Sequence, residues 1–245
     1  MTRLTTCASA EAVAVRAAEE VARHLKLAVA ERGVGHIALS GGTTPARTYE
    51  LLARRPEQWS GGEVWFADER CVDAEDEQSN YRLVADTLLR GAEIPLQRVH
   101  RMEAEEGPDE GARRYAEALR AHVTTDGAPS GRHALPVLDL ILLGIGPDGH
   151  VASLFPDAAT LDADESAVCL GVLDSPKPPP ERISLSLAVL RAARRCLLLA
   201  TGASKADAVT AMLAEPSRHV PASLLRRERL TVILDDAAAG DRLRR

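Results

Sequence analysis

Short apolar segments alternate with helix-like segments along most of the chain, and this alternation limits the possible folds more than any other feature. Apolar segments of this length are typical of strands buried on both faces, as in a parallel sheet covered by helices. Strands are predicted at Ile37–Ser40, Val64–Ala67, Leu138–Leu143, Val168–Leu173, Ile183–Leu187, Cys196–Ala200 and Leu230–Leu234. Helices are predicted at Ala10–Ala30, Pro45–Ala53, Asn80–Leu89, Asp109–His122, Lys205–Leu213 and Asp236–Leu243. The pattern predicts parallel βαβ units, in an α/β fold whose sheet has helices on both faces.

The length of the chain, 245 residues, is ordinary for a single α/β domain. Thr124–Ala134 contains Gly127, Pro129 and Gly131 and is predicted to be a loop. It is not predicted to link two domains, because neither flank could bury a complete core alone. We therefore expect one domain over residues 1–245.

Composition and charge exclude several classes of protein. Hydrophobic residues make up 45% and charged residues 27% of the chain, as in globular proteins. A net charge of −6 offers no general electrostatic attraction for nucleic acid. No signal peptide or membrane anchor is recognised, so a cytoplasmic protein is predicted. The cysteines form no Cys-x-x-Cys pair, which predicts small buried side chains and neither a zinc site nor a disulfide framework; they are Cys7, Cys71, Cys169 and Cys196.

The segment LDLILLGIGPDGHVASLFP, residues 138–156, is predicted to be a strand that leads into an active-site loop. The turn Gly144–Pro147 places Asp148 and His150 beyond the carboxyl end of the strand, where open α/β sheets hold their ligands. A histidine, with an ordinary pKa of about 6.5, supplies a neutral imidazole base at pH 7, and an adjacent carboxylate can fix its tautomer. The alternative is a solvated turn with an incidental histidine.

The segment Ser40–Pro45 follows a predicted strand and opens a helix, with Thr44 as the expected N-cap and Pro45 at the first helical position. Backbone N–H groups of Gly41, Gly42 and Thr43, together with the helix N-terminus, can bind a phosphate. A plain strand-to-helix turn remains the alternative reading of these glycines.

Two cations and a charged strand end add to this prediction. Lys205 in the first turn of a helix is unfavourable unless an anion or Asp207 faces it, and Arg182 follows the stiff segment Pro178–Pro180. After Val64–Ala67, Asp68 and Arg70 are expected on one face of an extended chain and Glu69 on the other. A surface ion pair is the alternative for Asp68 and Arg70.

Five blocks resemble 6-phosphogluconolactonases in order and spacing. They are ALSGGTTP at 38–45, VWFADERCV at 64–72 with QSNY at 78–81, GIGPDGHVASLFP at 144–156, SPKPPPERISLSL at 175–187 and TGASKADAV at 201–209. The resemblance implies a three-layer Rossmann-like fold of the sugar-phosphate deaminase and ribose-phosphate isomerase type. It also implies hydrolysis of 6-phospho-D-glucono-1,5-lactone to 6-phosphogluconate in the pentose phosphate pathway, with no metal or coenzyme.

The resemblance also implies roles for single residues. His150 is the base, and either Asp148 or Asp68 orients it, so the implied catalytic residues are His150, Asp148 and Asp68. The phosphate lies between Gly41–Thr43, Arg182 and Lys205. Asp68, Arg70 and Asn80 line the lactone end, and Arg70 is a partner of either the phosphate or the developing oxyanion. The implied partner is a small phosphosugar lactone, with no nucleic acid and no membrane, and the chain is expected to be a monomer or a small homo-oligomer.

Two other functions remain open at this stage. Glucosamine-6-phosphate deaminases share the glycine loop, the Asp-Gly-His and the distal arginine and lysine. In sequences that resemble that family, the Asp-Gly-His is followed by Phe-Asn-Glu-Pro, whose glutamate supplies a carboxylate. Here the corresponding residues are Leu154-Phe155-Pro156, which supply none. A sugar-phosphate-sensing domain of a transcription regulator would usually need a basic helix-turn-helix segment, and none precedes the first predicted strand.

Overall fold

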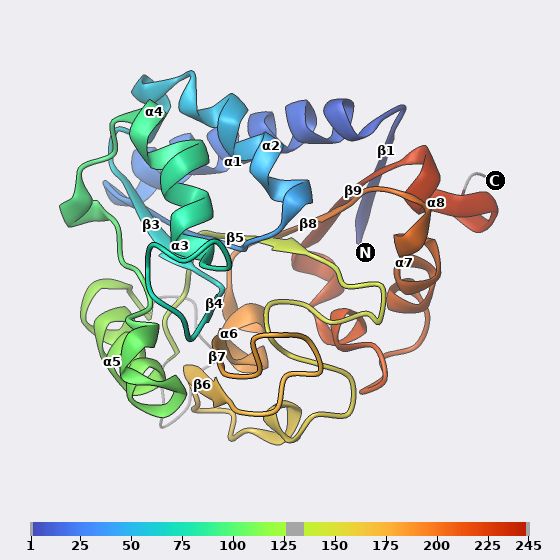
Figure 1. Cartoon of the computed structure of the whole chain (residues 1–245). Coiled ribbons are helices and arrows are strands. Elements are labelled where there is room, and N and C mark those ends of the chain that lie inside the picture. The colour runs from blue at the N-terminus through green and yellow to red at the C-terminus, as the bar shows by residue number, and fades with distance from the viewer. Residues whose placement is uncertain (1, 126–134, 244–245) are drawn as a thin grey trace.

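The structure, a computed structural model, describes residues 2–125 and 135–243 and contains two sheets (Figure 1). The larger has six strands in the order β1-β9-β8-β5-β2-β3, and all neighbouring strands are parallel. The strands are β1 (Arg3–Cys7), β2 (Gly35–Leu39), β3 (Gly62–Phe66), β5 (Leu140–Gly144), β8 (Cys196–Ala200) and β9 (Leu230–Asp235). The predicted α/β fold with a parallel sheet is confirmed; β1 was not predicted.

The smaller sheet is antiparallel and corrects part of the prediction. It has three strands in the order β4-β7-β6, which are β4 (Asp68–Arg70), β7 (Arg182–Leu185) and β6 (Cys169–Val172). The prediction that the segments at 168–173 and 183–187 belong to parallel units is wrong. A parallel connection requires a crossover, usually a helix, whereas the chain from 173 to 181 is a helix-free loop, which suffices for an antiparallel pair.

Most helices agree with the predicted periodicity, but the helix predicted over Asn80–Leu89 is α-helical only to Val84 and continues as a π-helix over Ala85–Leu89. Ser9 caps the first by accepting from the Ala12 N–H, and Gly33 ends it in the left-handed conformation. A further helix begins where Leu187 was expected in a strand, because the Ser186 hydroxyl caps it by accepting from the Val189 N–H. The helices are α1 (Ala10–Arg32), α2 (Thr43–Ala53), α3 (Asn80–Val84), α4 (Arg90–Ala92), α5 (Pro108–His122), α6 (Leu187–Ala192), α7 (Ala206–Leu213) and α8 (Asp236–Leu243).

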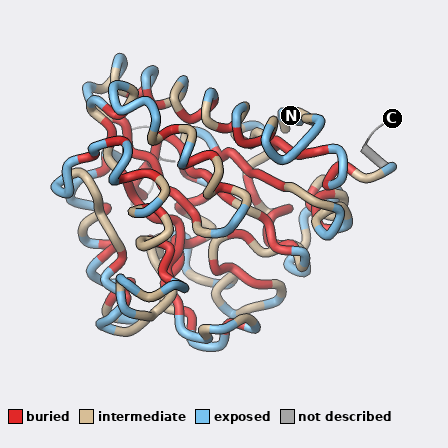
Figure 2. Tube along the Cα trace, turned by 45° about the horizontal axis from the view of Figure 1, so that its top comes forward, coloured by how far each residue is buried: buried red, intermediate tan, exposed pale blue. Residues whose placement is uncertain are grey.

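Two layers cover the parallel sheet (Figure 1). Helices α1 and α2 lie on one side, and α1 packs along β2 and β9. Helix α6 and the small sheet lie on the other side, where α5 packs against β6 and β7. Buried residues follow the strands through the centre of the molecule (Figure 2), and the strands β2 and β8 are buried along their whole length.

The prediction of buried cysteines is confirmed only in part, and the predicted loop at 124–134 lies mostly outside the described residues. All four cysteines are free thiols, but only Cys196 is fully buried, while the other three are half-buried. The predicted loop at 124–134 lies, from residue 126 onward, outside the described residues. Within 2–125 and 135–243, no helix combines the length and apolar character needed to cross a bilayer.

Candidate active site

A pocket of about 210 Å³ opens where the chain leaves the carboxyl ends of β2, β5 and β8. Nine of the ten residues singled out in the sequence line it: Gly41, Gly42, Thr43, Asp68, Arg70, Asn80, His150, Arg182 and Lys205. The tenth, Asp148, is hydrogen-bonded to His150. Segments far apart in the sequence therefore meet at one edge of the parallel sheet, as ligand sites of α/β folds do.

His150 and Asp148 form a close pair. The Nδ1 atom of His150 lies 2.6 Å from Oδ1 of Asp148, and the imidazole packs against the Phe155 ring with centroids 4.8 Å apart. A Cβ atom at Gly146 would lie 2.0 Å from His150 Nδ1 and 2.3 Å from Asp148 Oδ1, so glycine is required for the pair to form. Asp148 therefore fixes the ring and leaves Nε2 as the nitrogen available for proton transfer.

The glycine loop fits closely against Asn80. A Cβ atom at Gly41 would lie 1.8 Å from Asn80 Oδ1, and Gly42 has a φ of 106°. The expectation that Thr44 caps α2 is wrong, because α2 already begins at Thr43 and Gly42 occupies the cap position without a side-chain bond. The Thr44 hydroxyl instead lies 3.0 Å from that of Thr201 and joins this loop to the one that carries Lys205.

Asp68 and Asn80 are buried and hold each other. The Asn80 amide donates to the Asp68 backbone carbonyl over 2.9 Å, and the Ser153 hydroxyl donates to the Asp68 carboxylate over 2.8 Å. Asp68 therefore supports Asn80 and the loop after His150, whereas the imidazole bonds to Asp148. Asn80 Oδ1 and Ser40 Oγ are buried without a hydrogen-bond partner among the described residues, and Asn80 Oδ1 packs directly against Gly41.

Glu69 points away from the pocket, as the strand alternation predicted, and organises the segment behind it. Its carboxylate accepts from the backbone N–H groups of Arg70, Asn80 and Tyr81 over 2.7–2.8 Å. Burial raises the pKa of Glu69 to about 7, although these hydrogen bonds favour the charged form. Glu69 thus binds the first two backbone N–H groups of α3, whose N-cap is Ser79, and fixes Asn80 at the first helical position.

Arg70 and Arg182 face each other across the β4–β7 ladder, where they are register partners. The Arg70 guanidinium donates to the Gln78 carbonyl, and that of Arg182 donates to the carbonyls of Lys177, Pro178 and Pro179. Burial, with the charge of Arg70, lowers the pKa of Arg182. Because like charges directly opposite in a ladder are unfavourable, a bound anion would relieve this pair.

Lys177 was not singled out in the sequence, yet it lines the pocket. Its Nζ lies 3.3 Å from Asp148 Oδ1 and 3.3 Å from His150 Nδ1. Burial raises the pKa of Asp148, but the His150 bond and the charges of His150 and Lys177 outweigh it and hold that pKa well below its usual range. The chain has only three lysines and two of them, Lys177 and Lys205, line this pocket, which is a signal available in the sequence.

Lys205 precedes α7 and forms no ion pair with Asp207 within 2–125 and 135–243. Burial and the charge of Lys177 lower its pKa, while Asp148 raises it. Four cations and two carboxylates thus meet at this pocket, which gives it an excess of positive charge in an acidic chain. Among the described residues, no group of three or more His, Cys, Asp or Glu is arranged to hold a metal ion.

Comparison with known proteins identifies the family. Residues 8–234 match the family model described as glucosamine-6-phosphate isomerases/6-phosphogluconolactonase. The chain belongs to this family. A 6-phosphogluconolactonase of Streptomyces coelicolor is 37% identical over 96% of this chain and 92% of its own length. The isomerase/lactonase family membership agrees with the resemblance seen in the five sequence blocks.

Solved structures of the family share the fold. The 6-phosphogluconolactonase from Trypanosoma cruzi superposes with a TM-score of 0.88 at 26% identity, covering 98% of this chain and 97% of the other. A monomeric glucosamine-6-phosphate deaminase superposes with a TM-score of 0.79 over 97% of this chain and 99% of the other, but at 21% identity it supports the fold alone.

Proposed function

We propose that the protein hydrolyses 6-phospho-D-glucono-1,5-lactone to 6-phosphogluconate, the second step of the oxidative pentose phosphate pathway. The observation that carries this proposal is the His150–Asp148 pair, 2.6 Å apart, at the edge of a pocket with four cationic side chains. A lactone hydrolase needs one base, a place for the developing oxyanion and a way to orient the ester. The names of the relatives that match nearly the whole chain support the same reaction.

In this mechanism, His150 acts as general base and then as general acid. Asp148 bonds to Nδ1, so Nε2 takes a proton from the water whose oxygen attacks the lactone carbonyl carbon. The tetrahedral intermediate collapses with cleavage of the bond between the carbonyl carbon and the ring oxygen. Nε2 returns the proton to that ring oxygen, which becomes a free hydroxyl. The carboxylic acid formed at the same time ionises to the carboxylate and releases a proton to the solvent. Asp148 is a positioning residue that also stabilises the imidazolium.

The remaining pocket residues position the substrate. The phosphate is assigned to the backbone of Gly41–Thr43, to Arg182 and to Lys205, with Arg70 held beside Arg182 by the ladder. Asp68 and Asn80 line the lactone end. Anchoring a remote phosphate converts binding energy into orientation of the carbonyl next to His150.

Deamination of glucosamine-6-phosphate fits this pocket less well. Opening the amino sugar and moving a proton at carbon would require a further carboxylate near the base. The position beside His150 is occupied by the Phe155 ring, with centroids 4.8 Å apart. The groups present that can donate or accept a proton therefore suffice for lactone hydrolysis and lack the extra carboxylate that deamination needs.

The proposal is tested by adding freshly prepared 6-phosphogluconolactone to the pure protein and following proton release against spontaneous hydrolysis. We expect hydrolysis far above the background rate, both before and after exhaustive chelation, and no ammonia from glucosamine-6-phosphate. Ammonia release would favour the deaminase. Inertness toward both compounds, combined with tight sugar-phosphate binding, would favour a sensor.

Lys177 is expected to contribute to turnover through its contact with Asp148, the residue that orients His150. Its Nζ lies 3.3 Å from Asp148 Oδ1. Lys177→Met should therefore lower kcat/KM for the phosphorylated lactone by about tenfold. Lys26→Met, which replaces an exposed lysine on α1, is the matched control. An unchanged kcat/KM in Lys177→Met would exclude this role.

We also propose that residues 1–245 form one domain, because a single core cluster includes buried side chains of both sheets, such as Ile141 and Ile183. Three further expectations from the sequence stay predictions. They are a cytoplasmic location, the absence of nucleic-acid and membrane partners, and a monomeric or small homo-oligomeric state.

A further inference from the structure

A second and larger cavity lies at the opposite end of the parallel sheet from the catalytic pocket. Its volume is about 620 Å³. It is lined where β1, β5, β8 and β9 begin, by residues such as Arg3, Asp139, Arg195 and Leu230, and by the carboxyl-terminal half of α1. Strands of five residues separate the two ends by about 15 Å, so this cavity belongs to a different face of the molecule.

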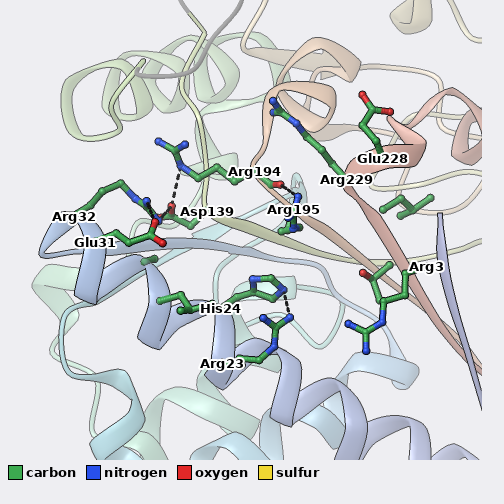
Figure 3. A pocket seen from close by; sticks show the side chains of 14 residues that line it. Arg3, Arg23, His24, Glu31, Arg32, Asp139, Arg194, Arg195, Glu228 and Arg229 are labelled. Atoms are coloured by element: carbon green, nitrogen blue, oxygen red, sulfur yellow. Dashed lines mark hydrogen bonds and ion pairs between the residues drawn. The ribbon is translucent and has the colours of Figure 1, made fainter. Parts of the chain in front are cut away.

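Arginine side chains dominate the lining of this cavity (Figure 3). Arg194, Arg195 and Arg229 lie along one side, and α1 faces them with Arg23 and His24. Burial, assisted by the charge of Arg23, lowers the pKa of His24 to about 4, so its imidazole is neutral at pH 7. In all, six arginines line the cavity against three carboxylates: Arg3, Arg23, Arg32, Arg194, Arg195 and Arg229 against Glu31, Asp139 and Glu228.

The three carboxylates are already engaged by other groups. Asp139 bonds Arg32 over 2.8 Å, contacts Arg194 over 3.4 Å and accepts from the His36 N–H over 2.9 Å. Glu31 pairs with Arg32. Glu228 is bound over 2.8 Å by Arg226, which does not line the cavity.

Arg195 and Arg229 have no carboxylate partner within the described part of the chain. Arg195 donates to the Arg194 carbonyl, and Arg229 donates to the carbonyls of Ala192 and Ala193 over 2.7 and 3.0 Å. Burial, with the charges of Arg226, Arg195 and Arg194, lowers the pKa of Arg229. Glu20 on α1 pairs with Arg23 over 2.5 Å and with Arg3 over 3.8 Å. The positive charge without a carboxylate partner is therefore that of Arg195 and Arg229, although the chain as a whole carries a charge of −6.

We propose that this cavity is a second binding site, distinct from the catalytic pocket, for a small organic polyphosphate with at least two phosphate groups. Planar guanidinium groups bind phosphate oxygens in bidentate fashion, and several of them converge here. The volume is in the range of cavities that hold small organic ligands and exceeds what one phosphate needs. Leu27, which is 45% exposed and also lines the cavity, offers an apolar contact to the organic part.

The test is titration calorimetry with ATP as the probe at low salt, with AMP and inorganic tripolyphosphate as the comparison ligands. The Arg3→Ala/Arg195→Ala variant removes two exposed arginines of the cavity. Its Kd for ATP should rise by about tenfold or more. The Arg113→Ala/Arg114→Ala variant removes two exposed arginines of α5 and should bind ATP within about twofold of the wild type. AMP should bind more weakly than ATP because it bears a single phosphate.

The Lys205→Ala variant tests whether ATP binds at the catalytic pocket instead. Because Lys205 does not line the second cavity, this variant should keep the wild-type Kd for ATP. Equal affinity in wild type and Arg3→Ala/Arg195→Ala, or loss of ATP binding in Lys205→Ala, would overturn the proposal. So would the absence of ATP binding at millimolar concentration in the wild type. Tripolyphosphate binding as tight as that of ATP would overturn the assignment of an organic ligand. None of these results depends on which reaction the catalytic pocket carries out.

Discussion

His150→Ala is expected to lower kcat for 6-phosphogluconolactone by at least about a hundredfold and to leave KM nearly unchanged. The imidazole acts on the attacking water in the transition state, whereas the phosphate is held by other groups of the pocket. Its side chain is hydrogen-bonded to Asp148 and packs against the Phe155 ring at the edge of the pocket, so its loss removes little of the core packing. The rates are measured by proton release with freshly made lactone, after subtraction of the spontaneous reaction.

The matched control is His219→Ala, which removes a histidine that also pairs with an aspartate, at 2.7 Å from Asp157, but is exposed and does not line the pocket. Its kcat should equal that of the wild type. Near wild-type turnover in His150→Ala, with the fold verified by circular dichroism, would remove His150 from the mechanism.

Lys205→Ala is expected to raise KM for the phosphorylated lactone by about ten- to a hundredfold, the contribution of one charge-assisted hydrogen bond. Hydrolysis of unphosphorylated gluconolactone should change little, because that substrate has no phosphate to bind. The quantity to measure is kcat/KM for the phosphorylated lactone divided by kcat/KM for gluconolactone. This ratio should fall in the variant. Lys26→Ala, on the surface of α1, serves as the control and should keep the ratio.

An equal loss for both lactones in Lys205→Ala would mean that the lysine supports the site as a whole and does not bind phosphate. Competitive inhibition by inorganic phosphate in the wild type, weakened in Lys205→Ala, is the independent check on the same assignment.

The features that the sequence predicted correctly are those set by local physics. Asp148 and His150 are two residues apart on a glycine turn, so their contact depends on one short loop. Strands such as Cys196–Ala200 are continuous apolar runs, which identify a strand buried on both faces. The position of Gly41–Thr43 at a strand end and a helix start follows from the same local pattern.

The features that were missed depend on pairing between distant segments. An apolar run does not reveal the direction of its partner strand, so the antiparallel strands β6 and β7 were predicted to be parallel. The contact of Lys177 with Asp148 depends on the path of the proline segment over the pocket. The cap of α2 shifted from Thr44 to Gly42 because the Thr44 hydroxyl bonds across to Thr201, a contact that no local rule predicts.

The pairing of β1 with β9 has a consequence for the order in which the chain is made. The strand Arg3–Cys7 is bonded to Leu230–Asp235, and β9 also lies between β1 and β8. At a synthesis rate of about 5–20 residues per second, β1 leaves the ribosome on the order of ten seconds or more before its partner exists. For that whole interval β1 has no place in the growing sheet, and once β8 has been made it is an open edge of the sheet until β9 follows. Nascent chains stalled before Leu230 should therefore resist proteases less well than released chains, in which β1 is paired with β9.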